Sequence, residues 1–137
     1  MKETRHLGVY AAIIENDSIL LVKKARGAYL GKLDLPGGSI EHGEKPEETL
    51  KRELKEEIGI SVDDNDLILL KTNTEKENVN VFRDVYVINK DIQINHLEFI
   101  DSEVSDAKYV TIEEFKNMID KGEAFKWLEW FYEEYCK

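Results

Sequence analysis

Residues 38–60 have the sequence GSIEHGEKPEETLKRELKEEIGI, in which three glutamates are spaced to share one face of a helix. Glu53, Glu56 and Glu57 stand at positions i, i+3 and i+4, and a helix turns by about 100° per residue. Like charges at these spacings cost about 0.2–0.5 kcal/mol per pair, so this face needs a cation. Carboxylate oxygens select hard divalent ions, Mg²⁺ first and Mn²⁺ or Ca²⁺ as substitutes. The stretch therefore predicts a metal-binding helix.

The same stretch also indicates how this helix is held in place. Pro46 suits its first turn, and Gly59 suits the left-handed position that ends a helix, so we expect a helix over residues 46–58. An apolar stripe at i, i+4 and i+8 predicts the buried face: Leu50, Leu54 and Ile58. Arg52 has Glu48 and Glu56 four residues away on either side. Its guanidinium either fixes a carboxylate beside the metal or forms a plain surface ion pair.

The spacing of these residues resembles the signature of the Nudix hydrolases. The matching positions are Gly38, Glu44, Arg52-Glu53-Leu54, Glu56-Glu57 and Gly59-Ile60. This resemblance implies an enzyme that hydrolyses a nucleoside diphosphate linked to another moiety. A water would attack phosphorus, with Mg²⁺ as the cofactor or Mn²⁺ as its substitute. The resemblance does not name the other moiety.

The family's site residues carry over by position. The metal ligands fall on Glu53, Glu56 and Glu57, with the backbone carbonyl of Gly37 as a further ligand and Glu44 as a supporting carboxylate. Arg52 counts among the catalytic residues because it orients a carboxylate. The general base lies either in the motif or on a later loop: Glu53 is the first choice, Glu103 the loop candidate and Glu98 a third. For each loop acid alone, a solvated carboxylate is the plainer interpretation.

Two arginines are candidates for binding the substrate's phosphates. Arg26 belongs to a basic stretch, residues 18–33, that contains no acid, although a solvated strand end explains the stretch equally well. Arg83 shares a strand face with several valines, where it either lines the cleft or packs its stem at an edge. A nucleoside triphosphate is the favoured substrate. The alternatives are a nucleotide sugar, an ADP-ribose-type substrate, or a non-catalytic regulatory module that only binds nucleotides.

Composition limits the other functional classes. The chain has 137 residues, which suits a single Nudix hydrolase domain over residues 1–137. Its net charge of −10 argues against a nucleic-acid polymer as partner and leaves a small nucleotide. The apolar run over residues 7–14 is too short to span a membrane, and the lone Cys136 suits a reducing compartment, so we expect a cytoplasmic protein.

The remaining pattern predicts an α/β fold, an α/β/α sandwich around a mixed, largely antiparallel central sheet. We expect strands near residues 7–14, 18–24, 33–35, 66–74, 79–89 and 107–110, with turns at 15–17 and 76–78. Helices are expected at 111–121 and 123–135. The aromatic run over residues 125–132 predicts a helix docked on the sheet; a ring stacked on the substrate's base and a homodimer contact are the other interpretations.

Overall fold

The computed structural model describes residues 5–75, 80–99 and 103–137. Its strands are β1 (Arg5–Ala12), β2 (Ile14–Glu15), β3 (Ser18–Lys24), β4 (Leu33–Asp34), β5 (Gly37–Ser39), β6 (Leu67–Glu75), β7 (Asn80–Ile88) and β8 (Val104–Thr111). The α-helices are α1 (Pro46–Ile58), α2 (Ile112–Asp120) and α3 (Leu128–Phe131). Short 3₁₀ turns occur at Asp64–Asp66 and Ile94–His96, and a π-helical turn at Tyr132–Cys136 follows α3.

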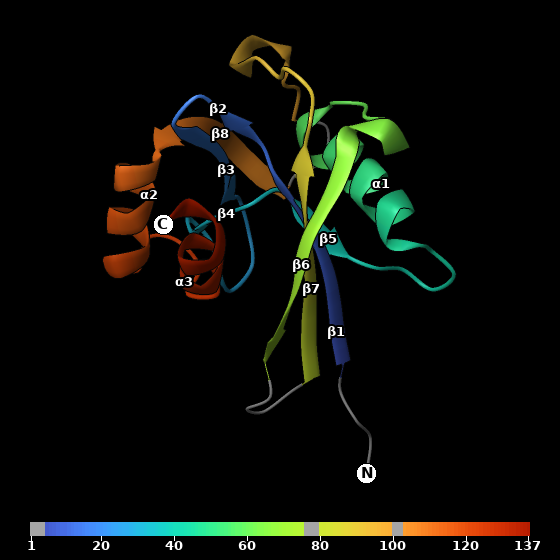
Figure 1. Cartoon of the computed structure of the whole chain (residues 1–137), viewed down its shortest axis with the longest axis horizontal. Coiled ribbons are helices and arrows are strands. Elements are labelled where there is room, and N and C mark those ends of the chain that lie inside the picture. Colours follow the sequence, from blue (N-terminus) through green and yellow to red (C-terminus); the bar gives the residue numbers. More distant parts are fainter. Residues whose placement is uncertain (1–4, 76–79, 100–102) are drawn as a thin grey trace.

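The strands form two hydrogen-bonded sheets between two layers of helices. One sheet has the order β5-β1-β7-β6, with β1 and β7 parallel and the other pairs antiparallel. In the other, β3 pairs antiparallel with β2, β4 and β8. Helix α1 lies on one side of the strands and helices α2 and α3 on the opposite side (Figure 1). The predicted α/β sandwich with mixed, largely antiparallel pairing is confirmed, with its strands divided between two sheets.

Strands β1 and β3 contribute to both hydrophobic cores because successive side chains of a strand point to opposite faces. Val9 and Ala11 of β1 pack in the core that contains the apolar stripe of α1. Tyr10 and Ala12 pack in the other core, with Phe115 of α2 and the aromatic residues near the C-terminus. These strands are buried on both faces, which explains why they read as nearly continuous apolar runs.

Helix α1 has the bounds that the sequence predicts, residues 46–58. Leu50, Leu54 and Ile58 have no exposed surface, and Gly59 ends the helix with φ 73°. A Cβ atom at Gly59 would lie 2.8 Å from the backbone oxygen of Glu98, so this glycine also admits the segment that follows the second 3₁₀ turn. The helix is therefore fixed by its apolar face and at its C-terminal end.

The predicted helix over residues 123–135 is wrong at its start. Leu33 donates its backbone N–H to the Glu123 carbonyl at 2.9 Å, and Phe125 donates to the Leu33 carbonyl at 3.0 Å, so residues 123–125 lie extended beside β4. Pairing with a distant strand replaces helix formation until Leu128. The Gly37–Ser39 segment, which lies outside the predicted strands, is also a strand, because it pairs with Gly8–Tyr10 of β1. The predicted turn at 76–78 lies outside the described residues.

Strand β8 begins at Val104, earlier than the predicted strand at 107–110, and its longer pairing with β3 brings Glu103 to the site described below. Within the described residues, every helix is too short or too polar to cross a membrane.

Candidate metal and nucleotide site

Three carboxylates gather where α1 faces the start of β8. Glu53, Glu57 and Glu103 each offer an oxygen, and these oxygens lie within 4.8 Å of one another. Glu53 and Glu57 are buried, while Glu103 is exposed. We refer to these three residues as the carboxylate cluster. The motif glutamates Glu53 and Glu57 are thus brought together as expected, and the loop candidate Glu103 joins them.

Glu57 is the most deeply buried member of the cluster. Its Oε1 accepts a hydrogen bond from the backbone N–H of Gly37 at 2.8 Å, and its Oε2 lies 3.7 Å from the Lys24 ammonium. Strand β5 therefore approaches α1 closely enough for its backbone to orient a carboxylate. The contact is made by the N–H of Gly37, and ligation through the Gly37 carbonyl stays a prediction.

Gly38 makes room for the carboxylate of Glu53. A Cβ atom at Gly38 would lie 2.5 Å from Cδ, 2.6 Å from Oε1 and 2.7 Å from Oε2 of Glu53. Such distances are well inside van der Waals contact, so any side chain here would displace the carboxylate. This close approach explains the glycine in the motif without any requirement for an unusual φ angle.

Arg52 connects the carboxylates of the motif. Its Nε donates to Glu44 Oε2 at 2.8 Å and its Nη2 to Glu44 Oε1 at 3.0 Å, which is a bidentate fork. Its Nη1 donates to Glu53 Oε1 at 2.9 Å and to Glu56 Oε2 at 3.2 Å. Hydrogen bonds from Arg52 hold the pKa of Glu44 at about 2. Arg52 thus orients Glu53 while Glu44 holds Arg52.

Glu56 lies beside the cluster and not within it. Its side chain is exposed and accepts a hydrogen bond from Arg52. Metal ligation by Glu56 stays a prediction. Burial raises the pKa of Glu53, while the hydrogen bond from Arg52 lowers it. Glu53 therefore combines a fixed orientation with an environment that favours accepting a proton.

Glu103 contacts the segment that follows β3 through a backbone hydrogen bond and an ion pair. The Ala25 N–H donates to the Glu103 carbonyl at 2.8 Å, and Arg26 Nη2 lies 3.4 Å from Glu103 Oε1. The predicted phosphate-binding residue Arg26 is thus next to the cluster and contacts one of its members. Glu98, the third base candidate, is not a member of the cluster in the described part of the chain.

A cavity of about 610 Å³ opens beside the cluster, a size within the usual range for ligand pockets. One set of its lining residues belongs to the cluster, to β5 and to the loop that follows β5: Gly37, Gly38, Ser39, Glu41, Glu53 and Glu103. The other set is aromatic or charged: Tyr10, Lys24, Tyr29, Asp34, Arg83, Phe125 and Trp127. Arg83, predicted as either a cleft or an edge residue, lines this cavity. It donates to Asn73 Oδ1 at 3.0 Å and lies 4.9 Å from the Trp127 ring centre.

Asp34 is the cavity residue that the sequence reasoning missed. Its carboxyl group is only 3% exposed and accepts hydrogen bonds from the Leu35 N–H at 2.8 Å and Trp127 Nε1 at 3.1 Å. Burial raises its pKa to about 7, although Lys24 and these hydrogen bonds act in the opposite direction. The sequence did offer one sign of a buried acid, because Asp34 stands between Leu33 and Leu35.

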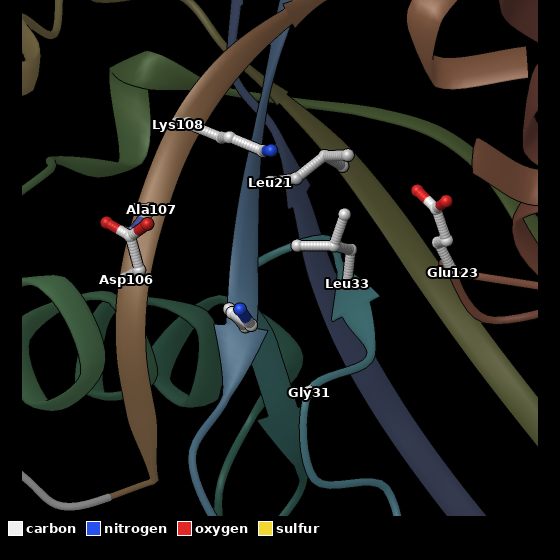
Figure 2. A pocket seen from close by; sticks show the side chains of 8 residues that line it. Leu21, Gly31, Leu33, Asp106, Ala107, Lys108 and Glu123 are labelled. Atoms are coloured by element: carbon white, nitrogen blue, oxygen red, sulfur yellow. Dashed lines mark hydrogen bonds between the residues drawn. The ribbon is translucent and has the colours of Figure 1, made fainter. Parts of the chain in front are cut away.

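A smaller cavity of about 270 Å³ lies elsewhere and shares no lining residue with the larger one. Figure 2 shows Lys108 and Asp106 on β8 and Glu123 on the opposite side of Leu21 and Leu33. Asp106 resembles Asp34 locally, because its Oδ1 accepts the N–H of the next residue, Ala107, at 2.9 Å. Asp106 therefore has the same local hydrogen bond as Asp34 but lines the other cavity.

The donor set of the cluster fits a hard divalent cation. All three groups are carboxylates, which match Mg²⁺ or Mn²⁺ and not the softer metals that prefer sulfur or imidazole. Like charges at this separation repel one another, and the cations Arg52, Lys24 and Arg26 each lie beside one of the three carboxylates. A bound divalent cation would reduce the repulsion among the three carboxylates.

Comparison with known proteins agrees with this geometry. A family model described as the NUDIX domain matches residues 4–131. The chain belongs to the NUDIX family. The prediction that the protein is a Nudix hydrolase is confirmed. Two of the three cluster residues, Glu53 and Glu57, therefore lie on the helix of the Nudix motif, residues 38–60.

Individual relatives give the same family. The chain is 30% identical over 122 residues to the nucleoside triphosphatase NudI of Salmonella arizonae, covering 81% of this chain and 86% of that protein. It is 48% identical over 48 residues to the 8-oxo-dGTP diphosphatase of Escherichia coli, a match that spans 34% of this chain and 37% of that enzyme. The crystal structure of a MutT NUDIX hydrolase from Burkholderia pseudomallei has a TM-score of 0.69 at 23% identity, covering 81% of this chain and 86% of that one. This structural likeness supports the fold.

Proposed function

We propose that this Nudix hydrolase cleaves a phosphoanhydride bond of a nucleoside diphosphate derivative, with a nucleoside triphosphate as the favoured substrate. The observation that carries the proposal is the carboxylate cluster at the edge of a cavity large enough for a nucleotide. A pyrophosphate group carries dense negative charge, and its hydrolysis needs that charge neutralised and the phosphates oriented. The cluster and the cations around it meet both needs.

The roles of the residues follow from their positions. Glu53, Glu57 and Glu103 would hold the divalent cation, Mg²⁺ or Mn²⁺, with Glu56 and the Gly37 carbonyl as further candidate ligands. When bound, such a cation neutralises phosphate charge and lowers the pKa of a water. Arg52 fixes the orientation of Glu53, our first choice as general base, and Glu103 is the other candidate. Lys24 and Arg83 supply positive charge along the cavity.

The substrate preference is drawn from the relatives. NudI is a nucleoside triphosphatase by name, and the shorter match is to an 8-oxo-dGTP diphosphatase. Both names denote enzymes that act on nucleoside triphosphates, which supports that class here over nucleotide sugars and ADP-ribose. The cytoplasmic location and the homodimer stay predictions.

The test is a hydrolysis panel with purified protein. Canonical and oxidised nucleoside triphosphates, nucleotide sugars, ADP-ribose and dinucleoside polyphosphates are incubated with Mg²⁺ or Mn²⁺, and the products are separated. We expect a nucleoside triphosphate to give a monophosphate and pyrophosphate. Reaction in ¹⁸O-labelled water then locates the attacked phosphorus by the product that carries the label.

Variants connect turnover to the cluster. Glu57→Gln and Glu53→Gln keep the shape of the side chain and remove its charge, so we expect kcat to fall by about 10²–10⁴-fold. Glu129→Gln, an exposed change on α3, is the matched control and should retain full activity. Full metal-dependent turnover by Glu57→Gln would refute the proposed site. Nucleotide binding without any turnover across the panel would instead support the regulatory module.

A further inference from the structure

The aromatic part of the 610 Å³ cavity contains a carboxyl group with unused hydrogen-bonding capacity. Both hydrogen bonds that the described residues donate to Asp34 end on Oδ1. Above its pKa of about 7 the carboxyl group is ionised and both oxygens accept, so Oδ2 keeps an acceptor position for a molecule in the cavity. Burying a carboxyl group is costly unless its polar atoms are satisfied. A ligand that donates a hydrogen bond to Oδ2 would satisfy the remaining acceptor positions of Asp34.

The extended segment at 123–125 explains how this group comes to line the cavity. Backbone hydrogen bonds between Leu33 and residues 123 and 125 fix the C-terminal segment alongside β4. Trp127 is thereby placed with its indole N–H on Asp34, across 93 residues of sequence. The position of Oδ1 is thus fixed by two donors, one from each of two paired segments.

The ring of Trp127 is already packed and does not offer a stacking surface. It is 7% exposed, with Tyr10 at 4.9 Å between ring centres and the Arg83 guanidinium at 4.9 Å from its centre. The second aromatic pair in the cavity, Tyr29 and Phe125, has ring centres 4.8 Å apart, and Tyr29 is 58% exposed. Exposed aromatic rings stack on any nucleobase. Tyr29 and Phe125 are therefore the available platform, and Trp127 is a positioning residue.

We propose that Asp34 determines base specificity: its Oδ2 accepts a hydrogen bond from an amino or ring N–H on the edge of a nucleobase that stacks against Tyr29 and Phe125. The inference rests on the proposed function, because it assumes a nucleotide in this cavity. It assigns the charged lining residues different tasks. The carboxylate cluster and Lys24 face the phosphates, whereas Asp34 reads the base.

The geometry makes Asp34→Asn an informative variant. Leu35 N–H and Trp127 Nε1 are both donors, so the amide oxygen of asparagine takes the place of Oδ1. The amide NH₂ group must then replace Oδ2. The substitution therefore converts an acceptor that faces the base into a donor, with little change in volume. A purely structural role for Asp34, holding Trp127, would survive this change because the Oδ1 contacts persist.

The experiment compares nucleotides that differ by one edge donor. At about pH 9, where Asp34 is ionised, we measure kcat/KM for GTP, ITP and N1-methyl-GTP, and for ATP and purine riboside triphosphate. For the preferred base, the ratio of kcat/KM between the nucleotide with the recognised N–H and the nucleotide without it should be about 10 to 100 in the wild-type protein. A factor of this size is expected for a hydrogen bond to a charged group. Asp34→Asn should reduce that ratio to less than about threefold. The matched control is Asp106→Asn, which changes an aspartate with the same local hydrogen bond in the other cavity (Figure 2) and should keep the wild-type ratio.

The outcomes separate the two proposals. Turnover of any nucleotide supports the proposed function, whatever the ratios are. Ratios near one in the wild type for every pair, or unchanged ratios in Asp34→Asn, overturn the role of Asp34. If Asp34→Asn does not fold, the same ratios are measured for Asp34→Ser, and wild-type ratios in that variant overturn the role of Asp34. If no nucleotide is hydrolysed, the proposed function fails, and calorimetric affinities of the same nucleotide pairs decide the role of Asp34 in binding.

Discussion

The guanidinium of Arg52 forms a fork on the carboxylate of Glu44, with Nε to Oε2 at 2.8 Å and Nη2 to Oε1 at 3.0 Å. Glu44 is fixed in turn, because its Oε1 also accepts from the Glu41 N–H and the Thr49 hydroxyl, both at 2.9 Å. The remaining nitrogen of Arg52 is left to hold Glu53. The loop before α1 therefore controls the orientation of a cluster carboxylate through one arginine.

Arg52→Lys should lower kcat by about 10- to 100-fold with a small loss of stability. Lysine keeps the charge but cannot form a fork and hold a second carboxylate at the same time, so Glu53 loses its orientation. Steady-state kinetics across a Mg²⁺ titration would measure the effect. Unchanged kcat would show that orientation of Glu53 by Arg52 is unnecessary.

Glu44→Gln should reduce kcat by a comparable factor although Glu44 is not a member of the carboxylate cluster. The amide accepts through one oxygen only, so the fork on Arg52 is broken from the other side. The double variant Arg52→Lys/Glu44→Gln should be little worse than either single variant, because all three lose the same contact. Additive losses in kcat would contradict the coupling.

Gly38→Ala should abolish most turnover while the protein stays folded. Its Cβ would meet the Glu53 carboxylate at 2.5–2.7 Å and push it out of the cluster. Gly122→Ala is the contrasting variant: its φ of 77° costs an alanine about 1–2 kcal/mol, but no atom lies within 4 Å. We expect Gly122→Ala to lower the melting temperature and leave kcat unchanged. We expect Gly38→Ala to lower kcat and leave the melting temperature nearly unchanged. Equal turnover in the two variants would count against the steric argument.

Leu54→Ala should destabilise the fold by about 2–5 kcal/mol in denaturant unfolding, because it removes a fully buried side chain between α1 and the strands. Ile68→Ala on β6 removes a similar apolar side chain that is 50% exposed, and should cost less than about 1 kcal/mol. Similar losses for both would mean that the α1 core contributes less than its burial implies.

Local pattern was sufficient for α1 and β3, whose bounds agree with the sequence prediction. The helix is defined by Pro46, Gly59 and its apolar stripe, which are all signals within one turn of the residues they affect. The strand Gly37–Ser39 and the extended residues 123–125 were missed because their structure comes from pairing with β1 and β4. Glycine-rich and aromatic-rich sequences carry no local sign of such partners.

The same division holds for the site. The motif spacing predicted that Glu53 and Glu57 share a helix face, and the structure places both in the cluster. The place of Glu103 depends on the long β3–β8 pairing and on Ala25, which no local pattern reveals. The contact between Asp34 and Trp127 joins residues 93 positions apart. The helix residues were therefore predictable from local spacing, whereas the fold was needed to select Glu103 among the loop candidates and to place Asp34 in the cavity.

Asp34 should make the free energy of unfolding fall as pH rises from about 4 to 7. Its pKa is raised by burial from 3.8 to about 7, so in this interval the folded protein binds a proton that the unfolded chain has released. The contribution lost across the interval is on the order of 4 kcal/mol. Lys24 and Arg83 are the nearby charges that favour the ionised form and limit the effect. We would measure urea unfolding of the wild type and of Asp34→Asn at several pH values and subtract the two curves. The difference should decline across this window. A flat difference for Asp34→Asn would mean that this carboxyl group is already ionised near pH 4.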